Sequence, residues 1–181
     1  MTTTLRFWQR PAAIESAGEI DWEAVYTSEM PRIFNYFWYR LGDSAVAEDL
    51  TATTFEKAWR ARARYRSKRA AFSTWLHTIA RNVANDYYRR HRPTRSLDEI
   101  QAQPSAQFPA DVAEQNDESA RLAWLLARLP ARERELIALK YGAGLTNREI
   151  ARLTTLSESN VGTVLNRVTS RLRKMWEPPS G

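Results

Sequence analysis

The chain has 181 residues, which is enough for one or two small helical domains and excludes a large barrel enzyme. Its 27 Lys and Arg outnumber its 21 Asp and Glu, and the resulting net charge of +6 favours polyanionic partners such as nucleic acids. Because the chain contains no cysteine, disulfides, cysteine-ligated metals and thiol nucleophiles are excluded.

The ends of the chain carry no pattern that directs it to a membrane. No stretch approaches the ~18 apolar residues that a membrane span requires, and the first residues lack the apolar core of a signal peptide. We therefore expect a cytoplasmic protein without membrane insertion. Residues 1–20 are interpreted as an N-terminal extension, either disordered or docked through Phe7 and Trp8, and residues 177–181 as a tail.

Apolar residues recur at three- and four-residue steps along residues 21–92, which predicts helices. The first helix follows residues 22–41, and we expect Pro31 to kink or divide it and Gly42 to end it. No run of alternating β-branched residues between turn signals occurs, so we predict an all-α fold.

A second helix is predicted over residues 44–65, capped by Asp43 or Ser44, and a third over residues 72–87. The second helix is expected to expose Glu48 and Asp49 near its start, where negative charge suits the helix dipole. Its expected inward residues are Val46, Leu50, Thr53 or Thr54, Phe55 and Trp59.

Basic side chains are concentrated between Lys57 and Arg92, where eleven Lys and Arg face a single acid and are interleaved with aromatic rings. Cations of this kind follow a nucleic-acid backbone, while aromatic faces accept unstacked bases at roughly 1–3 kcal/mol each. The segment predicts a single-stranded nucleic-acid site. Helical spacing nevertheless assigns Trp75 to the core and leaves Phe72 open between core and site. The expected polar face of the third helix comprises His77, Arg81, Asn82, Asn85 and Arg89.

Residues 93–118 differ in composition from the segments on either side. They hold six acids, one base and three of the eight prolines, without a sustained apolar period. This composition predicts an acidic, proline-containing linker between two small helical domains, at residues 21–92 and 119–176. Its acidity either keeps the chain in solution or shields the basic faces when no nucleic acid is bound.

The C-terminal half contains the pattern of a helix-turn-helix. Thr146 and Glu149 have the spacing of a capping box that opens a short helix, and Ser157 is placed to cap a longer one. Thr155, in the turn between them, is expected to adopt a left-handed conformation. In such motifs the second helix enters the major groove. The polar residues expected to face the groove are Ser159, Asn160, Thr163, Asn166 and Arg167.

These segments resemble a known family. The sequence GDSAVAEDLTATTFEKAW followed by FSTWLHTIARNVANDYYRRHR resembles region 2 of the sigma-70 family of RNA polymerase sigma factors. The sequence LARLPARERELIALKYGAGLTNREIARLTTLSESNVGTVLNRVTSRLRK resembles region 4 of the same family. The extracytoplasmic-function (ECF) group keeps only these two regions, in this order.

The resemblance implies a subunit that binds core RNA polymerase and directs initiation at promoters with minus-35 and minus-10 elements, without being an enzyme. The residues implied to bind the coiled coil of the β′ clamp are Glu48, Asp49, Leu50 and Phe55, and the leading helices of region 4 are implied to dock on the β flap. The residues implied to contact the minus-10 element, and to capture a flipped base there, are Arg66, Ser67, Lys68, Arg69, Ala71, Phe72 and Asn82. The residues implied to contact the minus-35 element are Arg148, Ser157, Ser159, Asn160, Thr163, Asn166, Arg167 and Arg171.

Four positions depart from the family pattern. Ala52 replaces a glutamine usual in the clamp segment, Gly162 and Val164 stand where many relatives carry Lys and Arg, and Thr155 stands where glycine is common. The resemblance leaves open whether an anti-sigma protein holds the chain inactive.

Two other classes of protein share some of these sequence features. A helix-turn-helix regulator that acts without polymerase is the alternative, but such proteins usually dimerise and do not explain the basic aromatic segment. A nucleic-acid enzyme is disfavoured because the chain has only His77 and His91, no glycine-rich phosphate loop and no carboxylate cluster on one predicted face. We therefore expect no cofactor and no metal.

Overall fold

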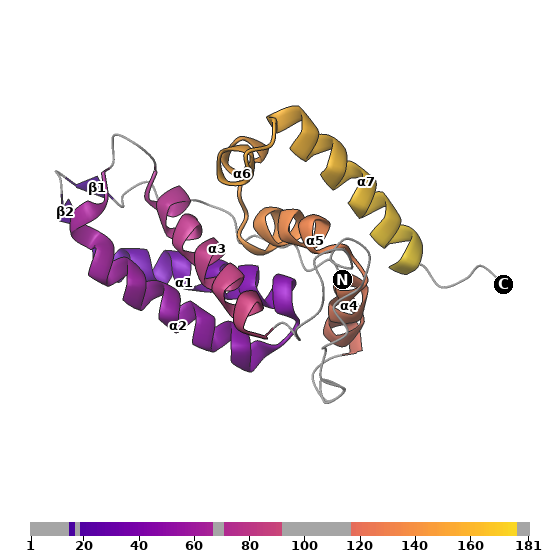
Figure 1. The fold of residues 1–181 in the computed structure, drawn as a ribbon, viewed down its shortest axis with the longest axis horizontal. Helices are drawn as coiled ribbons and strands as arrows, with labels where there is room; N and C mark the ends of the chain where they lie inside the picture. The colour runs from indigo at the N-terminus through magenta and orange to yellow at the C-terminus, as the bar shows by residue number, and fades with distance from the viewer. Residues whose placement is uncertain (1–14, 17–18, 67–70, 92–116, 177–181) are drawn as a thin grey trace, which may run out of the picture.

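The computed structural model describes residues 15–16, 19–66, 71–91 and 117–176. Phe7, Trp8, most of the expected linker and the tail lie outside the described residues. The all-α prediction is confirmed by helices that account for most of the described chain. The helices are α1 (Trp22–Leu41), α2 (Ser44–Ala61), α3 (Phe72–His91), α4 (Asp117–Ala127), α5 (Ala131–Ile137), α6 (Asn147–Thr154) and α7 (Glu158–Trp176) (Figure 1).

Four short elements supplement these helices. A 3-10 turn, η1 (Arg62–Arg64), follows α2, and a π-helical turn, η4 (Ala138–Gly142), continues α5. Strand β1 (Glu15–Ser16) pairs antiparallel with β2 (Glu19–Ile20). This two-residue ladder lies in the segment interpreted as an N-terminal extension, and nothing in the sequence pattern predicted it.

Helix α1 is one continuous helix, so of the two effects expected of Pro31, a kink or a division, the division is absent. Asp21 caps its start by accepting hydrogen bonds from two backbone N–H groups, and Gly42 ends it with φ 74°. A proline inside a helix removes the hydrogen bond to the carbonyl four residues earlier. Both Pro31 and Thr27, whose carbonyl loses that partner, are exposed, so water can replace the bond.

Helix α2 is capped by Asp43, one of the two residues predicted to cap it, and Thr54 faces the core as expected. Its buried residues are small ones, at Ala47, Thr51, Thr54 and Ala58, which allow α1 and α3 to pack closely on both sides. The larger side chains at Val46, Leu50 and Phe55 are half-buried. Trp59, expected to face inward, is 49% exposed, and the Arg62 guanidinium lies 4.1 Å from its ring.

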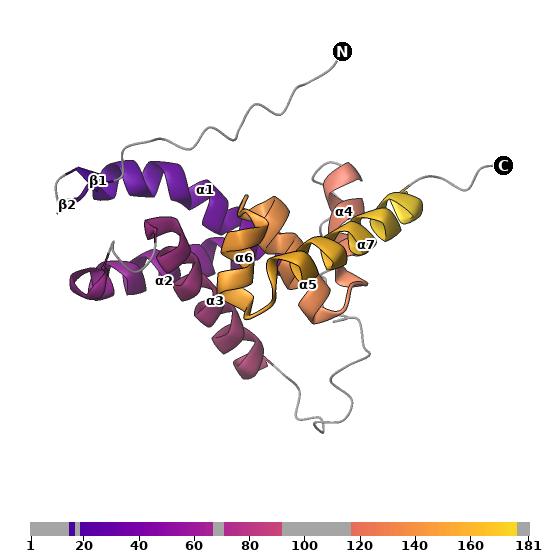
Figure 2. The ribbon, with the colours of Figure 1, turned by 90° about the horizontal axis from the view of Figure 1, so that it is seen from above.

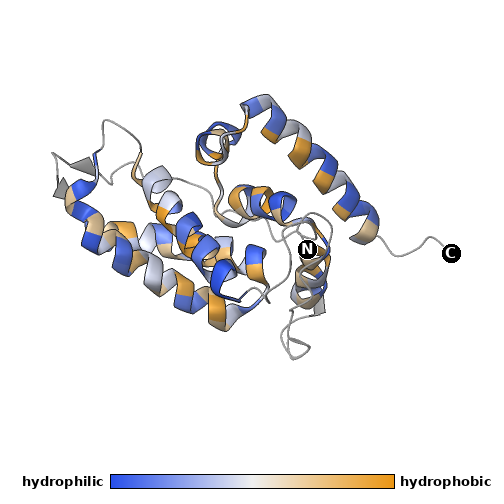
Figure 3. Ribbon diagram, in the orientation of Figure 1, coloured by the Kyte–Doolittle hydropathy of each residue, from blue (hydrophilic) through white to orange (hydrophobic). Residues whose placement is uncertain are grey.

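The two helical units share one hydrophobic core. Helices α1, α2 and α3 form the first unit and α4 to α7 the second, and they meet where α1 packs against α5 and η4 (Figures 1 and 2). Hydrophobic and hydrophilic residues alternate along α7, as expected of a helix with one buried side (Figure 3). None of the described helices is long and apolar enough to cross a membrane.

Gly142 lies where the backbones of the two units approach closely. A Cβ atom at this position would lie 2.8 Å from the carbonyl oxygen of Asn35 in α1, so a larger residue would force the backbones apart.

Arg134 closes the corner between α4 and α5 within the second unit. Its Nη2 donates to the carbonyls of Ala127 and Leu129 at 2.6 and 2.9 Å, which satisfies the end of α4.

Candidate nucleic-acid and polymerase interfaces

The helix-turn-helix geometry expected at α6 and α7 is present. Thr146 Oγ1 accepts from the Glu149 backbone N–H at 3.3 Å, and Glu149 Oε2 accepts from the Thr146 N–H at 2.8 Å, which completes the predicted capping box. Thr155 has φ 60° and ψ 17°, so the left-handed conformation expected for it is confirmed. Ser157 Oγ accepts from the Asn160 N–H at 3.1 Å and caps α7, as expected.

The outer face of α7 carries polar side chains. Val161, Leu165 and Val168 are buried against the rest of the unit, which leaves the opposite side of the helix in solvent. On that side the Thr163 hydroxyl donates to the Ser159 carbonyl at 3.0 Å. Arg171 of the minus-35 set is half-buried. The remaining members are exposed, at Arg148, Ser157, Ser159, Asn160, Thr163, Asn166 and Arg167.

Two arginines of this set are held by an acid that the sequence analysis did not single out. Glu133 lies in the first turn of α5, with its side chain 13% exposed. Its Oε1 accepts from Nη2 of Arg167 at 3.1 Å, and its Oε2 accepts from Nη2 of Arg171. The two arginine side chains are 64% and 41% exposed, so they face solvent while they are paired.

Aromatic rings gather where α3 begins. The Phe72 ring lies 5.8, 5.3 and 5.3 Å from the rings of Trp22, Tyr65 and Trp75, centroid to centroid. Phe72 is only 3% exposed. Of the two alternatives left open for Phe72, the structure favours the core, because three neighbouring rings cover it.

The rest of the minus-10 set is divided between described and undescribed residues. Arg66 and Ala71 are exposed on either side of the loop, and Ser67, Lys68 and Arg69 lie outside the described residues. Asn82 is exposed on α3, but ten residues of helix place it about 15 Å beyond Phe72 along the axis, at 1.5 Å per residue. The structure thus does not bring Asn82 and the Phe72 ring into one pocket.

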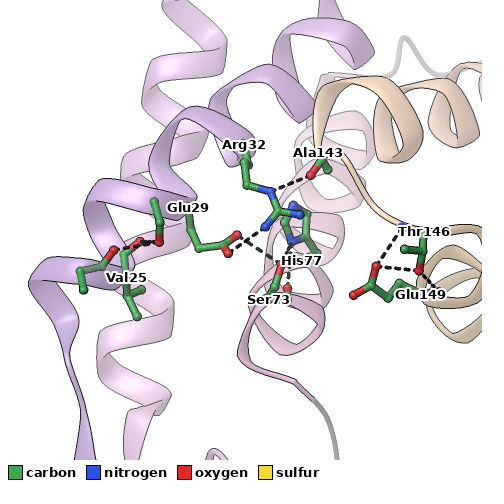
Figure 4. A network of polar contacts seen from close by, with 10 residues as sticks. Val25, Glu29, Arg32, Ser73, His77, Ala143, Thr146 and Glu149 are labelled. Carbon is green, nitrogen blue, oxygen red and sulfur yellow. Dashed lines mark hydrogen bonds and ion pairs between the residues drawn. The ribbon is translucent and has the colours of Figure 1, made fainter. Parts of the chain in front are cut away.

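A buried polar network connects α1, α3 and the turn before α6 (Figure 4). Arg32 Nε donates to the Ala143 carbonyl at 2.8 Å, and its Nη1 pairs with Glu29 at 3.0 Å. Glu29 also accepts from the Ser73 hydroxyl at 3.2 Å. His77 Nδ1 lies 2.8 Å from the Ser73 carbonyl, and burial lowers the pKa of His77 to about 4. His77, expected on an exposed polar face, is therefore a neutral core residue.

Ion pairs also cross between the two units. Glu135 Oε1 accepts from Arg40 Nη1 at 2.6 Å and from Arg81 Nε at 2.7 Å. Burial raises the pKa of Glu135, but the two guanidinium groups outweigh it and lower the pKa below its usual value. Arg81 also donates to the Leu153 carbonyl, and Arg40 to Asn85 Oδ1 at 3.2 Å. Arg81, expected on the polar working face, is thus half-buried between the units, whereas Asn85 is exposed, as expected, and accepts from Arg40.

The residues expected to bind polymerase follow one another along α2. Glu48 and Asp49 are exposed, and Leu50 and Phe55 are half-buried. The Phe55 ring meets the ring of Tyr26 from α1 at 5.0 Å, and Tyr26 is 53% exposed. The described residues hold no group of three or more His, Asp or Glu side chains that could bind a metal ion.

Comparison with protein-family models matches residues 25–94 to Sigma-70 region 2 and residues 120–172 to Sigma-70 region 4. The ECF RNA polymerase sigma factor RpoE of Cereibacter sphaeroides is 36% identical over 129 residues, which are 71% of this chain and 67% of that protein. The chain belongs to the ECF group of the sigma-70 family. This sigma factor is also similar to the ECF RNA polymerase sigma factor BldN of Streptomyces coelicolor, at 29% identity over 163 residues. The matched part is 88% of the chain but only 62% of BldN.

A solved structure supports the same fold. The sigma factor RpoE of Bartonella quintana, in complex with the anti-sigma factor NepR, superposes with a TM-score of 0.65 at 19% identity, covering 88% of this chain and 99% of that one. At this identity the likeness establishes the fold alone. In the present chain, regions 2 and 4 are in direct contact. The contact is made by the ion pairs of Glu135 with Arg40 and Arg81 and by the hydrogen bond from Arg32 to the Ala143 carbonyl.

Proposed function

We propose that this sigma factor binds core RNA polymerase and directs promoter-specific initiation of transcription. One observation carries the proposal: a single chain joins, in order, a region 2 with a basic aromatic segment and a region 4 whose α7 exposes a polar face. In this proposal the chain catalyses no reaction and needs no cofactor, because the polymerase supplies the chemistry. It acts in the cytoplasm, where bacterial DNA is transcribed.

Region 4 reads the minus-35 element through α7. Asn160, Thr163 and Arg167 recur at three- and four-residue steps, so their side chains share one face of the helix. The Asn160 amide can donate to and accept from a base edge, and the Arg167 guanidinium suits guanine or a phosphate. Arg148 and Ser157 lie near the starts of α6 and α7, where they can contact the flanking phosphates.

Region 2 reads and opens the minus-10 element at the loop that precedes α3. Arg66 and Ala71 lie exposed at the two ends of this loop, and the Phe72 ring cluster fixes the start of α3 from beneath. Lys68 and Arg69 supply charge for the displaced strand. Asn82 provides a separate polar position further along α3.

Polymerase binds along α2, with Glu48, Asp49, Leu50 and Phe55 as the contacts to the β′ clamp coiled coil. The half-buried Phe55 and its exposed neighbour Tyr26 give this surface an apolar centre beside two acids, which suits a protein partner. The helices α4 and α5 are the elements that dock on the β flap. Trp124 on α4 is 55% exposed and offers an aromatic anchor for that contact.

Simultaneous binding of both promoter elements requires the two units to separate. The element centres are about 25 base pairs apart, which is roughly 85 Å at 3.4 Å per base pair. In the structure, Arg81 of region 2 touches Leu153 of region 4, so the packed arrangement cannot span that distance. Residues 93–118 can reach about 86 Å when extended at ~3.3 Å per residue, which permits the separation.

An anti-sigma protein is a further partner in this proposal. The Bartonella quintana sigma factor of the same fold was solved in complex with the anti-sigma factor NepR. A protein that binds the packed arrangement of regions 2 and 4 would oppose the separation that promoter binding requires.

Run-off transcription tests the proposed function. Core RNA polymerase from the bacterium that encodes the chain is incubated with the chain and a library of promoter fragments. We expect transcripts only when chain and core are both present, from fragments that share two spaced elements. Dimeric footprints on DNA in the absence of polymerase would instead support a helix-turn-helix regulator that acts alone.

A further inference from the structure

Glu133 occupies an unusual position for an acid in a DNA-binding unit. It projects from the first turn of α5 toward α7 and is 13% exposed at its side chain. Both of its carboxylate oxygens accept from arginines of α7, Oε1 from Arg167 at 3.1 Å and Oε2 from Arg171. These arginines belong to the set that the proposed function assigns to the minus-35 element.

The two arginines continue the stripe of α7 that carries the base-reading candidates. At 3.6 residues per turn, Asn160, Thr163, Arg167 and Arg171 lie within an arc of about 80° on the helix surface. The buried residues of α7 lie on another side of the helix. Glu133 therefore holds the cationic end of the stripe, while the polar end with Asn160 remains exposed.

A carboxylate offers an arginine the same paired acceptors as a phosphate does. Each guanidinium uses one Nη2 group in the contact with Glu133 and retains other N–H donors. An arginine held in this way can still contact DNA that is docked in one register. It cannot swing freely to reach phosphates in the many registers of non-specific binding.

We propose that Glu133 is a specificity-determining positioning residue, which holds Arg167 and Arg171 by occupying the place of a DNA phosphate. It lowers the affinity of region 4 for arbitrary DNA and leaves the affinity for the matched minus-35 element nearly unchanged. This inference rests on the proposed function, because it requires that α7 read the minus-35 element.

The test uses the full chain assembled with core RNA polymerase. Two duplexes are compared, one with the minus-35 sequence that the wild-type holoenzyme selects from a randomised library and one with that sequence scrambled. Dissociation constants are measured by fluorescence anisotropy over a series of KCl concentrations. The variant is Glu133→Gln, which removes the charge and keeps the shape. The matched control is Glu118→Gln, at an exposed acid of α4, which changes the net charge of region 4 equally.

We expect Glu133→Gln to tighten binding to the scrambled duplex roughly three- to ten-fold at low salt, since two cations become free for phosphates. The slope of log affinity against log salt on that duplex should steepen by about 1–2, at ~0.9 for each added phosphate contact. Binding to the matched duplex should change less than about two-fold, so the specificity ratio falls. Glu118→Gln should change the affinity for both duplexes slightly and equally. An unchanged ratio, or an unchanged slope, in the Glu133→Gln holoenzyme overturns the inference.

A second variant tests whether the effect runs through the arginines. In a chain that carries Arg167→Gln and Arg171→Gln, adding Glu133→Gln should leave the salt slope unchanged. A persisting change would mean that Glu133 acts through its charge at a distance, which contradicts a positioning role. If the wild-type holoenzyme itself shows no preference for the selected duplex, the proposed function fails. If the wild type shows the preference and the variant retains it, only the inference about Glu133 fails.

Discussion

Glu135 of region 4 accepts a hydrogen bond from Arg40 of region 2 at 2.6 Å, across 95 residues of sequence. Arg40 is 7% exposed, and the same carboxylate oxygen also accepts from Arg81 at 2.7 Å. A single acid of α5 thus neutralises two guanidinium groups of the other unit. In the proposed function the two units separate when the chain binds a promoter, so we expect the contact made by this carboxylate to break.

Replacing Glu135 should weaken the packed arrangement. Glu135→Gln leaves Arg40 buried without its counter-charge, and we expect the free energy of unfolding to fall by roughly 2–4 kcal/mol. Urea unfolding measures this loss, and small-angle X-ray scattering should show a larger radius of gyration. Glu56→Gln is the control, because its ion pair with Arg60 is exposed and worth at most about 1 kcal/mol. Equal losses in the two variants would contradict the role assigned to Glu135.

His77 should make the fold sensitive to mild acid. Burial lowers the pKa of His77 from 6.5 to about 4, so the unfolded chain binds a proton more readily than the folded one. The contribution of neutral His77 to the free energy of unfolding is fully present above pH 6.5. It is lost as the pH falls from 6.5 toward 4, and the loss amounts to at most about 3 kcal/mol.

Urea unfolding midpoints between pH 7.5 and pH 5 measure this dependence. His77→Gln should flatten the profile in this range, whatever its effect on stability at pH 7.5. His91→Gln, at the exposed second histidine, is the control for the loss of an imidazole. A profile that stays equally steep in His77→Gln would show that another group is responsible.

Thr155→Gly should stabilise region 4. The left-handed conformation at Thr155, φ 60°, strains a β-branched residue but not glycine, so we expect a gain of about 1 kcal/mol in the free energy of unfolding. Thr154→Gly is the contrast, because a glycine at a helical position should lower the stability by about 1 kcal/mol. A lower melting temperature for Thr155→Gly would mean that the hydroxyl bond from Thr155 to the Thr154 carbonyl, at 2.6 Å, outweighs the strain.

The features that the sequence predicted correctly depend on neighbours in the sequence. The capping box of Thr146 and Glu149, the left-handed Thr155 and the helix end at Gly42 are each determined within four residues. Their chemistry is local, because a side chain caps the backbone of its own turn. Asp43, which caps α2, was one of two neighbouring residues predicted as its cap on the same grounds.

The contacts that sequence analysis missed join residues far apart in the sequence. Glu135 stands in a run of alternating charges that looks like a solvated helix, and its partner Arg81 is 54 residues away. His77 and Trp59 were misplaced for a related reason, since their positions depend on which side of α2 and α3 other helices cover. Periodicity identifies an apolar stripe, but it does not show where a second unit packs.

Asn160 should contribute to base recognition at the minus-35 element. It is exposed near the start of α7, and its amide can pair with a base edge in the major groove. We expect Asn160→Ala to weaken holoenzyme binding to a matched minus-35 duplex by about 1–3 kcal/mol and to leave a scrambled duplex nearly unaffected. An equal loss on both duplexes would identify a phosphate contact instead.

Asn82 should affect promoter opening rather than polymerase binding. It is exposed on α3, away from the ring cluster, and its amide offers both a donor and an acceptor to an extruded base. Asn82→Ala should leave the affinity for core polymerase unchanged, whereas Asp49→Ala combined with Phe55→Ala should reduce it. Permanganate reactivity of unpaired thymines at the start site should fall in Asn82→Ala.

The variant Phe72→Ala serves to distinguish a lost base contact at Asn82 from a general loss of folding stability. Because the Phe72 ring is buried among Trp22, Tyr65 and Trp75, Phe72→Ala should lower the free energy of unfolding by about 3–5 kcal/mol and so reduce polymerase binding and opening together. Asn82→Ala lies outside this cluster and should retain the wild-type melting curve. Reduced permanganate reactivity with an unchanged melting curve and unchanged polymerase affinity would therefore place the base contact at Asn82. Wild-type reactivity in Asn82→Ala would remove the base contact from this position and leave opening to the loop before α3.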